Sequence, residues 1–501
     1  MKMSEIVDEI RDFGHFLFYN GLLCDILKIV FLWRQNVSVQ TKENPLGYEK
    51  ISTLLGRFGI PSIVAMLVSS LYNIIDQIFI GQGVGYLGNA ATNVSFPFST
   101  VCLAIALLIG VGSASKFSLE LGRGNKESAA ECVGNAVWMI SVSGIVYLAL
   151  SLTFLEPLLK AFGATENILP YAKDYMSIIA VGMPFLIFTN AICNLIRADG
   201  SPKYSMACML VGAIINTVLD PIFIFVLDMG VKGAAYATVI SQFASFVMAF
   251  FYMWQFKQIK LAQKCFELRI RDCVGQASLG LSNSLNQLAI TLVQIVMNNS
   301  LSYYGARSIY GEDIPLSACG IVMKVNAIMI SFFVGLSQGS QPIIGFNYGA
   351  RKYDRVKKVY KLAVSWNFVV SVIGFIAFQF FPKQIISLFG SGEALYFEFA
   401  VKFMRTYLFM MLVNGVQTIS SNLFAAIGKP LKGVVLSMSR QVFFLIPLLL
   451  IFPVFWGIEG LLFAAPVADA FAFLISILMI FKEFKRMNSL KMAENNGKDG
   501  I

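Results

Sequence analysis

RFGIPSIVAMLVSSLYNIIDQIFIG, residues 57–81, is the stretch that decides the fold class. From Phe58 to Ile80 it is apolar for long enough to cross a bilayer as a helix, and Asp76 is the only charged residue in that interval. An acidic side chain at membrane depth is costly unless it faces protein or water and is neutralised by a proton, a cation or a partner. The stretch therefore predicts a membrane-spanning helix and marks Asp76 as a candidate functional residue.

The composition of the whole chain is that of a protein with many membrane spans. Of its 501 residues, 57% are hydrophobic and 14% are charged, and the mean hydropathy is +0.70. The formal net charge of +10 would fit nucleic acid as a partner, but the Lys and Arg residues lie in short loops between apolar runs, where orientation signals are found. We therefore expect the lipid bilayer as a partner and no nucleic acid.

Length and hydropathy predict twelve spans and their orientation. The spans lie at roughly 57–80, 91–114, 132–155, 171–195, 204–227, 232–256, 275–304, 316–338, 359–381, 402–425, 433–455 and 458–481. The even-numbered loops carry eighteen Lys and Arg residues, against seven in the odd-numbered loops and adjoining helix ends. By the positive-inside rule, both termini are expected in the cytoplasm.

A repeat divides these spans into two halves. Three turn motifs recur 227 or 228 positions later: Gly112-Ser113 as Gly339-Ser340, Gly200-Ser201-Pro202 as Gly428-Lys429-Pro430, and Gly230-Val231-Lys232-Gly233 as Gly457-Ile458-Glu459-Gly460. Each half holds six spans, an even number, so both halves begin on the same side of the membrane. The predicted fold is an all-α integral membrane protein with twelve transmembrane helices, in two six-helix bundles related by a pseudo-two-fold axis along the membrane normal.

The predicted domains follow from this repeat. They are an N-terminal extension at 1–50, an N-lobe at 51–256, a basic cytoplasmic linker at 257–274, a C-lobe at 275–481 and a cytoplasmic tail at 482–501. Within the extension, residues 21–33 have the length of an interfacial helix and are too short to span. An over-long start assignment explains the extension equally well.

Residues for nucleophilic or soft-metal chemistry are scarce. The eight cysteines form no CxxC pair, and the single histidine, His15, precedes the predicted spans. The short loops leave little room for a catalytic domain. We therefore expect no enzymatic activity and no cofactor other than a coupling ion.

Polar side chains from two other spans reach the depth of Asp76. Asn216 and Asp220 lie four residues apart on one face of span five, and Thr238 of span six comes to a similar depth. Pro221 disfavours a regular helix there and frees backbone carbonyls. Two carboxylates, an amide and a hydroxyl form a pocket of hard oxygen ligands that suits Na⁺ or a shared proton. In the alternative, Asp220 bonds within its own bundle and Asp76 snorkels to the outer face.

Other polar residues at membrane depth are candidates for a cavity or an ion pair. Those that could line a cavity or hold substrate are Tyr72, Asn73, Asn190, Asn194, Gln287 and Gln294. The amides among them serve equally well to hold helices together. Arg440 and Asp469 could meet as an ion pair, with a structural role favoured over a functional one. Lys324 is unpaired within its run and either faces the cavity or bonds to Asn326 and span seven.

With these residues in place, the chain resembles the multidrug and toxic compound extrusion (MATE) family, in its DinF-like branch, from about Asn44 to Met487. The similar stretches are ENPLGYEKISTLLGRFGIPSI, YNIIDQIFIGQ, LELGRGNKESA, RADGSPKYSM, NTVLDPIFIF, SQGSQPIIGFNYGARKYDRV, AAIGKP and SRQVFFLIP. The resemblance implies cation-coupled export by alternating access. It also implies a coupling site formed by Asp76, Asn216, Asp220 and Thr238. The acids that the NorM-like branch carries in spans seven and ten are absent here, which puts a cation site in the C-lobe in doubt.

The expected function is therefore Na⁺- or H⁺-coupled antiport that exports small organic, amphipathic cations, which is multidrug efflux and a source of antibiotic resistance. We expect a multi-pass protein of the bacterial inner membrane that functions as a monomer. The alternative is a flippase for lipids or lipid-linked oligosaccharides with a similar pair of bundles. That function predicts a basic central cavity, for which Lys324, Arg405 and Arg440 are few candidates.

Overall fold

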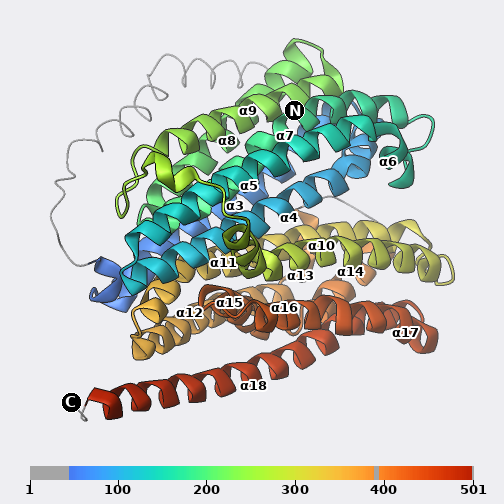
Figure 1. The fold of residues 1–501 in the computed structure, drawn as a ribbon. Coiled ribbons are helices and arrows are strands. Elements are labelled where there is room, and N and C mark those ends of the chain that lie inside the picture. Colours follow the sequence, from blue (N-terminus) through green and yellow to red (C-terminus); the bar gives the residue numbers. More distant parts are fainter. Residues whose placement is uncertain (1–43, 389–393, 499–501) are drawn as a thin grey trace. The chain divides into compact units, whose positions relative to one another are not determined.

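The computed structural model describes residues 44–388 and 394–498, and every regular element in these residues is helical (Figure 1). The chain separates into two units. The described part of the first unit is the short 3-10 helix Pro45–Gly47, whose first turn is capped by the Asn44 side chain. The second unit begins at Glu49 and holds all the long helices. The interfacial helix predicted at 21–33 lies outside the described residues.

The helices of the second unit follow the predicted order of spans. We name α3–α9 the N-lobe and α10–α18 the C-lobe. The N-lobe comprises α3 (Ile51–Gly83), α4 (Tyr86–Arg123), α5 (Lys126–Thr153), α6 (Leu155–Ala161), α7 (Leu169–Ala198), α8 (Pro202–Pro221) and α9 (Gly230–Tyr252). The C-lobe comprises α10 (Ile270–Gly305), α11 (Asp313–Gly349), α12 (Tyr353–Phe380), α13 (Pro382–Ser387), α14 (Ala394–Tyr407), α15 (Met411–Ala426), α16 (Pro430–Met438), α17 (Ile446–Trp456) and α18 (Ile458–Lys498).

Hydropathy alone finds fewer spans than the fold contains. In the described residues, ten helices are long and apolar enough to cross a membrane, and the pair α14 and α15, bent by 48°, makes an eleventh. The remaining predicted span, α10, is 36 residues long but carries many amide side chains. It packs along α4 and α16, so protein surrounds part of its polar surface.

Several elements differ from the predicted boundaries. Span ten is broken between Tyr407 and Met411 rather than continuous from 402 to 425. Spans five and eleven contain π-helical segments at Ile222–Val226 and Ser439–Leu445. The last helix, α18, continues to Lys498, so the predicted tail is helical where it is described. Proline and local packing cause such breaks, which hydropathy averages out.

The backbone repeats as the sequence motifs predict. Gly200 and Gly428 both adopt the left-handed region, with φ of 92° and 78°, and so do Gly230 and Gly457, with φ of 55° and 56°. These glycines end helices or reverse the chain at corresponding positions of the two lobes, where a Cβ atom would be strained. The two lobes therefore share their turns as well as their order of helices.

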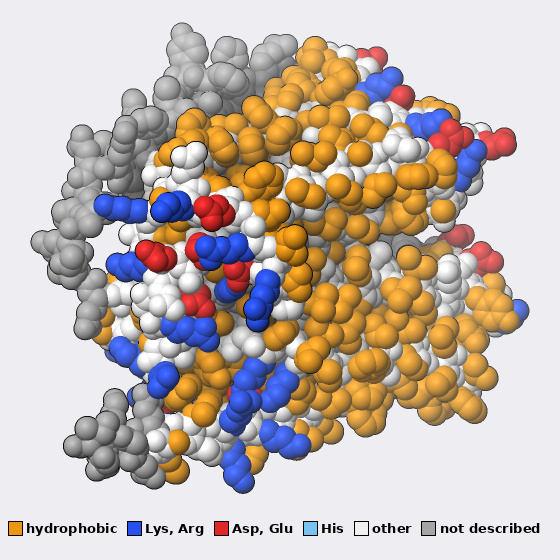
Figure 2. Space-filling model, viewed as in Figure 1, with side chains coloured by type: hydrophobic (Ala, Val, Ile, Leu, Met, Phe, Trp, Pro, Cys, Tyr) orange, Lys and Arg blue, Asp and Glu red, His pale blue; other side chains and the backbone are white. Residues whose placement is uncertain are grey.

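The loops richest in Lys and Arg share one end of the helices, which we call the basic end. It includes Arg123, Lys126, Lys203 and Lys358. Figure 2 shows Lys and Arg side chains gathered there, beside a broad belt of hydrophobic side chains. Exposed large apolar residues such as Ile145 and Phe481 are typical of a surface that faces lipid.

The two lobes meet closely in the half of the molecule nearest the basic end. Helices α3 and α4 of the N-lobe pack against α11 and α10 of the C-lobe. A Cβ atom added at Gly112 would lie 2.0 Å from the backbone oxygen of Gln276, and one at Gly280 would lie 1.9 Å from that of Leu108. Only glycine permits backbones to approach so closely. We call this contact the seam.

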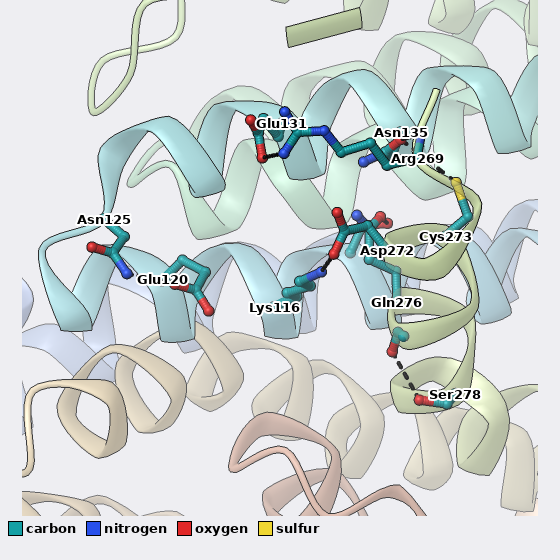
Figure 3. A network of polar contacts seen from close by, with 12 residues as sticks. Lys116, Glu120, Asn125, Glu131, Asn135, Arg269, Asp272, Cys273, Gln276 and Ser278 are labelled. Carbon is teal, nitrogen blue, oxygen red and sulfur yellow. Dashed lines mark hydrogen bonds and ion pairs between the residues drawn. The ribbon is translucent and has the colours of Figure 1, made fainter. Parts of the chain in front are cut away.

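Polar contacts also join the lobes along the seam. Figure 3 shows Lys116 of α4 and Asp272 of α10 pointing toward each other, and Arg269, which precedes α10, reaching Glu131 of α5. Cross-lobe hydrogen bonds include Ser113 to Gln276 at 2.8 Å, Gln341 to Ser115 at 2.7 Å, Arg197 to Gln338 at 2.9 Å and a Ser70–Ser331 pair at 2.6 Å. The seam therefore combines close backbone packing with paired polar groups.

Asp199, between α7 and α8, fixes the start of the segment that joins the lobes. Its carboxylate accepts hydrogen bonds from the Tyr252 hydroxyl at 2.7 Å and from the backbone N–H groups of Lys257 and Gln258 at 2.8 and 2.9 Å. Burial raises the pKa of Asp199 from 3.8 to about 7, although these three donors oppose the shift. The side chain is a structural anchor with an unusual titration range.

Replacement of Asp199 by Asn should lower the melting temperature of the protein in detergent. Asn offers one acceptor oxygen where the carboxylate offers two, and each buried donor left unpaired costs about 1–3 kcal/mol. The unfolded carboxyl ionises at its ordinary value, so the stability contributed by Asp199 falls as pH rises from 3.8 to about 7. Melting curves across that range should show a shallower pH dependence in the variant, and parallel curves would contradict this assignment.

Candidate functional site

Four polar side chains from three helices meet inside the N-lobe. Asp76 projects from α3, Asn216 and Asp220 from α8, and Thr238 from α9. The Asn216 amide donates to the Asp220 carboxylate at 3.1 Å and contacts the Thr238 hydroxyl at 3.3 Å. The carboxyl group of Asp76 lies next to that of Asp220. We call this group the acid pocket.

Three oxygen atoms of the acid pocket have no partner. Asp76 Oδ1, Asn216 Oδ1 and Asp220 Oδ2 are buried and accept no hydrogen bond from any described residue. Buried polar atoms in native proteins are almost always paired, and an unpaired carboxylate oxygen is especially costly. Three such oxygens on adjacent residues form the donor set that a small hard cation or a proton would satisfy.

The local sequence explains how α8 presents its two ligands. Asn216 and Asp220 are spaced four residues apart and therefore lie on the same helical face. Pro221 ends α8 because it has no amide hydrogen, and the chain continues as the π-helical segment Ile222–Val226. This irregular backbone next to Asp220 is typical of membrane sites where main-chain groups line a cavity.

Aromatic hydroxyl groups and a small cavity adjoin the acid pocket. Tyr72 and Tyr175 lie close to both carboxyl groups, and Tyr175 is a neighbour that the sequence did not reveal. A cavity of about 80 Å³ extends from Thr238 toward the basic end. Its polar lining comes from Ser69, Tyr72, Thr189, Asn190, Thr238, Ser241, Gln242 and Ser245. Tyr72 and Asn190, both candidate cavity residues, therefore line one hollow beside the acid pocket.

The other candidate lining residues lie apart from that cavity. Asn73 is exposed and donates to the Ser69 carbonyl at 2.7 Å. Asn194 is buried and accepts a 2.6 Å hydrogen bond from Arg197, so it supports the seam. Gln287 is half-buried and Gln294 is exposed on α10, in the other lobe. Sequence spacing placed these side chains at membrane depth but did not fix the direction in which they point.

In the C-lobe, the half-buried Arg440 and the buried Asp469 form an ion pair. Arg440 lies in the π-helical segment Ser439–Leu445, and Asp469 lies on α18. At the corresponding place in the N-lobe, 227 residues earlier, the chain has Ala213 and Gln242. The C-lobe pair therefore has no net charge, and the corresponding residues of the N-lobe, Ala213 and Gln242, cannot form an ion pair.

Replacement of Asp469 by Asn should destabilise the C-lobe by about 3–5 kcal/mol, because it leaves the Arg440 guanidinium buried without a counter-charge. The double variant Arg440→Met with Asp469→Leu should recover most of that loss, since it removes both charges. Denaturant titration in detergent measures both effects. Equal destabilisation of the single and double variants would show that the pair does not act as a unit.

Several contacts of the seam were not found from the sequence. Arg197 of α7 is fully enclosed and binds Ser205, Asn194 and, across the lobes, Gln338 of α11. Lys116 and Asp272 form an ion pair although they lie 156 positions apart in the sequence. The quoted motifs RADGSPKYSM and SQGSQPIIGFNYGARKYDRV contain Arg197 and Gln338, so the signal was present, but no periodicity indicates which motif meets which.

Two lobes of membrane-spanning helices that pack together at one end, with an acid pocket at membrane depth, are the arrangement of a membrane transporter. The MatE family model matches residues 61–222 and 283–451, more than half of the chain. The chain belongs to the MatE family of multidrug and toxic compound extrusion transporters. Multidrug export protein MepA of Staphylococcus aureus (strain N315) is 24% identical over 425 residues, covering 85% of this chain and 92% of MepA.

Further relatives and solved structures agree with this assignment. Probable multidrug resistance protein YoeA of Bacillus subtilis (strain 168) is 24% identical over 402 residues, covering 77% of this chain and 85% of YoeA. The fold matches an outward-facing multidrug resistance MATE transporter with a TM-score of 0.83 at 22% identity, over 90% of this chain and 99% of that one. A MATE structure in complex with MaL6 gives 0.84 at 22% identity, over 90% and 100%.

The family settles the fold and the general activity. The chain is a multi-pass membrane protein and a multidrug efflux transporter, not an enzyme. The predicted all-α fold of two lobes is confirmed. The flippase alternative is not favoured, because the similar proteins are named as multidrug exporters.

Proposed function

We propose that this protein is a cation-coupled antiporter that exports organic, amphipathic cations, and that the acid pocket is its coupling site. The observation that carries the proposal is the set of three unpartnered buried oxygens on Asp76, Asn216 and Asp220. A site that alternately holds and releases a cation needs oxygens that no protein group satisfies permanently. Either Na⁺ or a proton meets that need.

Exchange requires that ion and cargo favour different states of the transporter. A ligand with equal affinity for two states shifts neither. When the acid pocket is empty, its negative charge attracts a cationic cargo. When a cation or proton binds to Asp76 and Asp220, that charge is neutralised and the attraction weakens. Ion binding from outside is thereby linked to release of cargo to the outside.

The basic end is proposed to face the cytoplasm, in a bacterial inner membrane, with both termini on that side. The seam then closes the cytoplasmic side, and the structure corresponds to an outward-facing state. The cross-lobe hydrogen bond furthest from the basic end, among described residues, joins Ser70 and Ser331 at 2.6 Å. We propose that one chain, with its two lobes, is the functional unit.

Efflux from proteoliposomes tests this function and identifies the ion. Purified protein is reconstituted, a fluorescent organic cation is loaded, and a Na⁺ gradient and a pH gradient are imposed separately. We expect one gradient, or both, to drive the dye against its own concentration difference. Dye movement that only follows its own gradient would contradict coupled antiport, and the gradient that drives export names the ion.

A further inference from the structure

Lys324 of α11 is a charged residue at membrane depth for which the coupling site has no use. Its side chain is half-buried and makes no hydrogen bond or ion pair with any described residue. The other cation in the C-lobe interior, Arg440, is paired with Asp469. An unpaired ammonium group at this depth is costly, and such residues mark binding sites or pathways. The interaction with Asn326 or span seven that the sequence left open is not formed.

The helical face that carries Lys324 is the face that meets the N-lobe. Ser331, seven residues further along α11, contacts Ser70 of α3 at 2.6 Å. A Cβ atom at Gly335, the next turn, would lie 2.6 Å from the Cα atom of Ile63. Positions separated by seven residues lie on nearly the same side of a helix. Lys324 therefore faces α3, about 10 Å beyond the Ser70–Ser331 contact.

The opposing wall at that level belongs to the span that carries Asp76. Helices α3 and α11 run in opposite directions, so Gln77, seven residues after Ser70, lies level with Lys324. Asn73, on the same face of α3, is exposed. Asp76 lies on another face, turned toward Asp220 of α8. Lys324 thus faces α3 from the other lobe, level with the acid pocket but not paired with it.

We propose that Lys324 binds the anionic group of cargo between α3 and α11, so that the transporter selects zwitterionic amphiphiles that carry a carboxylate as well as an amine. The inference rests on the proposed export function. Beside this half-buried ammonium group, a carboxylate gains a charge-assisted hydrogen bond, whereas a cargo with positive charge alone meets a like charge. Lys324 then binds the negative charge of the cargo, while the charge of the acid pocket, on another face of α3, attracts its amine.

A matched pair of dyes tests this assignment. The probes are a rhodamine with a free carboxylate and the ethyl ester of the same dye, which lacks the negative charge. The variants are Lys324→Gln, Lys324→Arg and, as a control at the opposite end from the basic loops, Lys383→Gln. Equilibrium binding to purified protein and KM for export in proteoliposomes are measured for both dyes.

We expect Lys324→Gln to raise Kd and KM for the carboxylate dye about tenfold, the cost of losing a charged hydrogen bond, and to leave those for the ester equal or lower. Lys324→Arg should retain the preference, and Lys383→Gln should change neither dye. Equal effects on both dyes, or no effect, would overturn the inference. A different outcome would refute the proposed antiport alone. In that outcome the wild type binds the carboxylate dye preferentially and Lys324→Gln removes the preference, but the wild type shows no gradient-driven export.

Discussion

Replacement of either Asp76 or Asp220 by Asn should reduce gradient-driven efflux to background. Asn preserves the size of the side chain but removes the charge that must be neutralised and restored in each cycle. With a permanently neutral acid pocket, ion and cargo no longer favour different states, and coupling is lost. Efflux of a fluorescent cation from proteoliposomes under the active gradient measures the loss directly.

The controls separate loss of coupling from loss of folding. Both variants should reach the membrane and elute as single species in size-exclusion chromatography, because Asn relieves the unpaired buried charge rather than adding one. Lys383→Gln, at the opposite end from the basic loops and outside both the acid pocket and the face opposite Lys324, should leave efflux unchanged. Drug resistance retained by Asp76→Asn or by Asp220→Asn would exclude the acid pocket as the coupling site.

The second large effect is expected at the seam. Gly280→Val should abolish transport, because a Cβ atom there would lie 1.9 Å from the Leu108 carbonyl oxygen and α4 and α10 could not close. Overpacking of this kind costs about 1–3 kcal/mol where the backbone can shift to make room. Here the cost falls on the state in which the seam is closed. Spin labels on α5 and α12 at the basic end should report a longer distance between the lobes.

The matched control lies on the same helix. A Cβ atom at Gly275 would meet no atom within 4 Å, so Gly275→Val should transport normally and keep the short distance between the spin labels. Identical behaviour of the two valine variants would show that helix propensity, rather than closure of the seam, explains the defect. Gly112→Val, which faces Gln276 from the other lobe, should repeat the effect of Gly280→Val.

Depth along a helix could be predicted from the sequence, and it located the acid pocket. The rise of an α-helix is nearly constant, so Asp76, Asp220 and Thr238 could be assigned to one level by counting residues. Direction could not be predicted so well, because hydropathy does not distinguish a face in contact with protein from one in contact with lipid. Asn194 and Gln294 were therefore grouped with Asn190, although they lie in different surroundings.

The residues that contact each other between the lobes could not be predicted from the sequence, for a different reason. Gly112 and Gly339 were used only as markers of the repeat, yet both lie at the seam, where a neighbouring backbone passes within van der Waals contact. Contacts such as Arg197 with Gln338 join residues 141 positions apart, and no local pattern encodes such a partner. Breaks such as the π-helical segment around Arg440 depend on that tertiary packing as well.

The polarity of α10 bears on how the chain enters its membrane during synthesis. Its amides make it the least apolar of the long helices in the described residues, and a helix of this composition partitions weakly into lipid by itself. Its close neighbour α4 is made earlier, so a complementary surface already exists when α10 emerges from the ribosome. Biogenesis of the second half should therefore depend on the first, and the C-lobe expressed alone should insert with α10 in the wrong place.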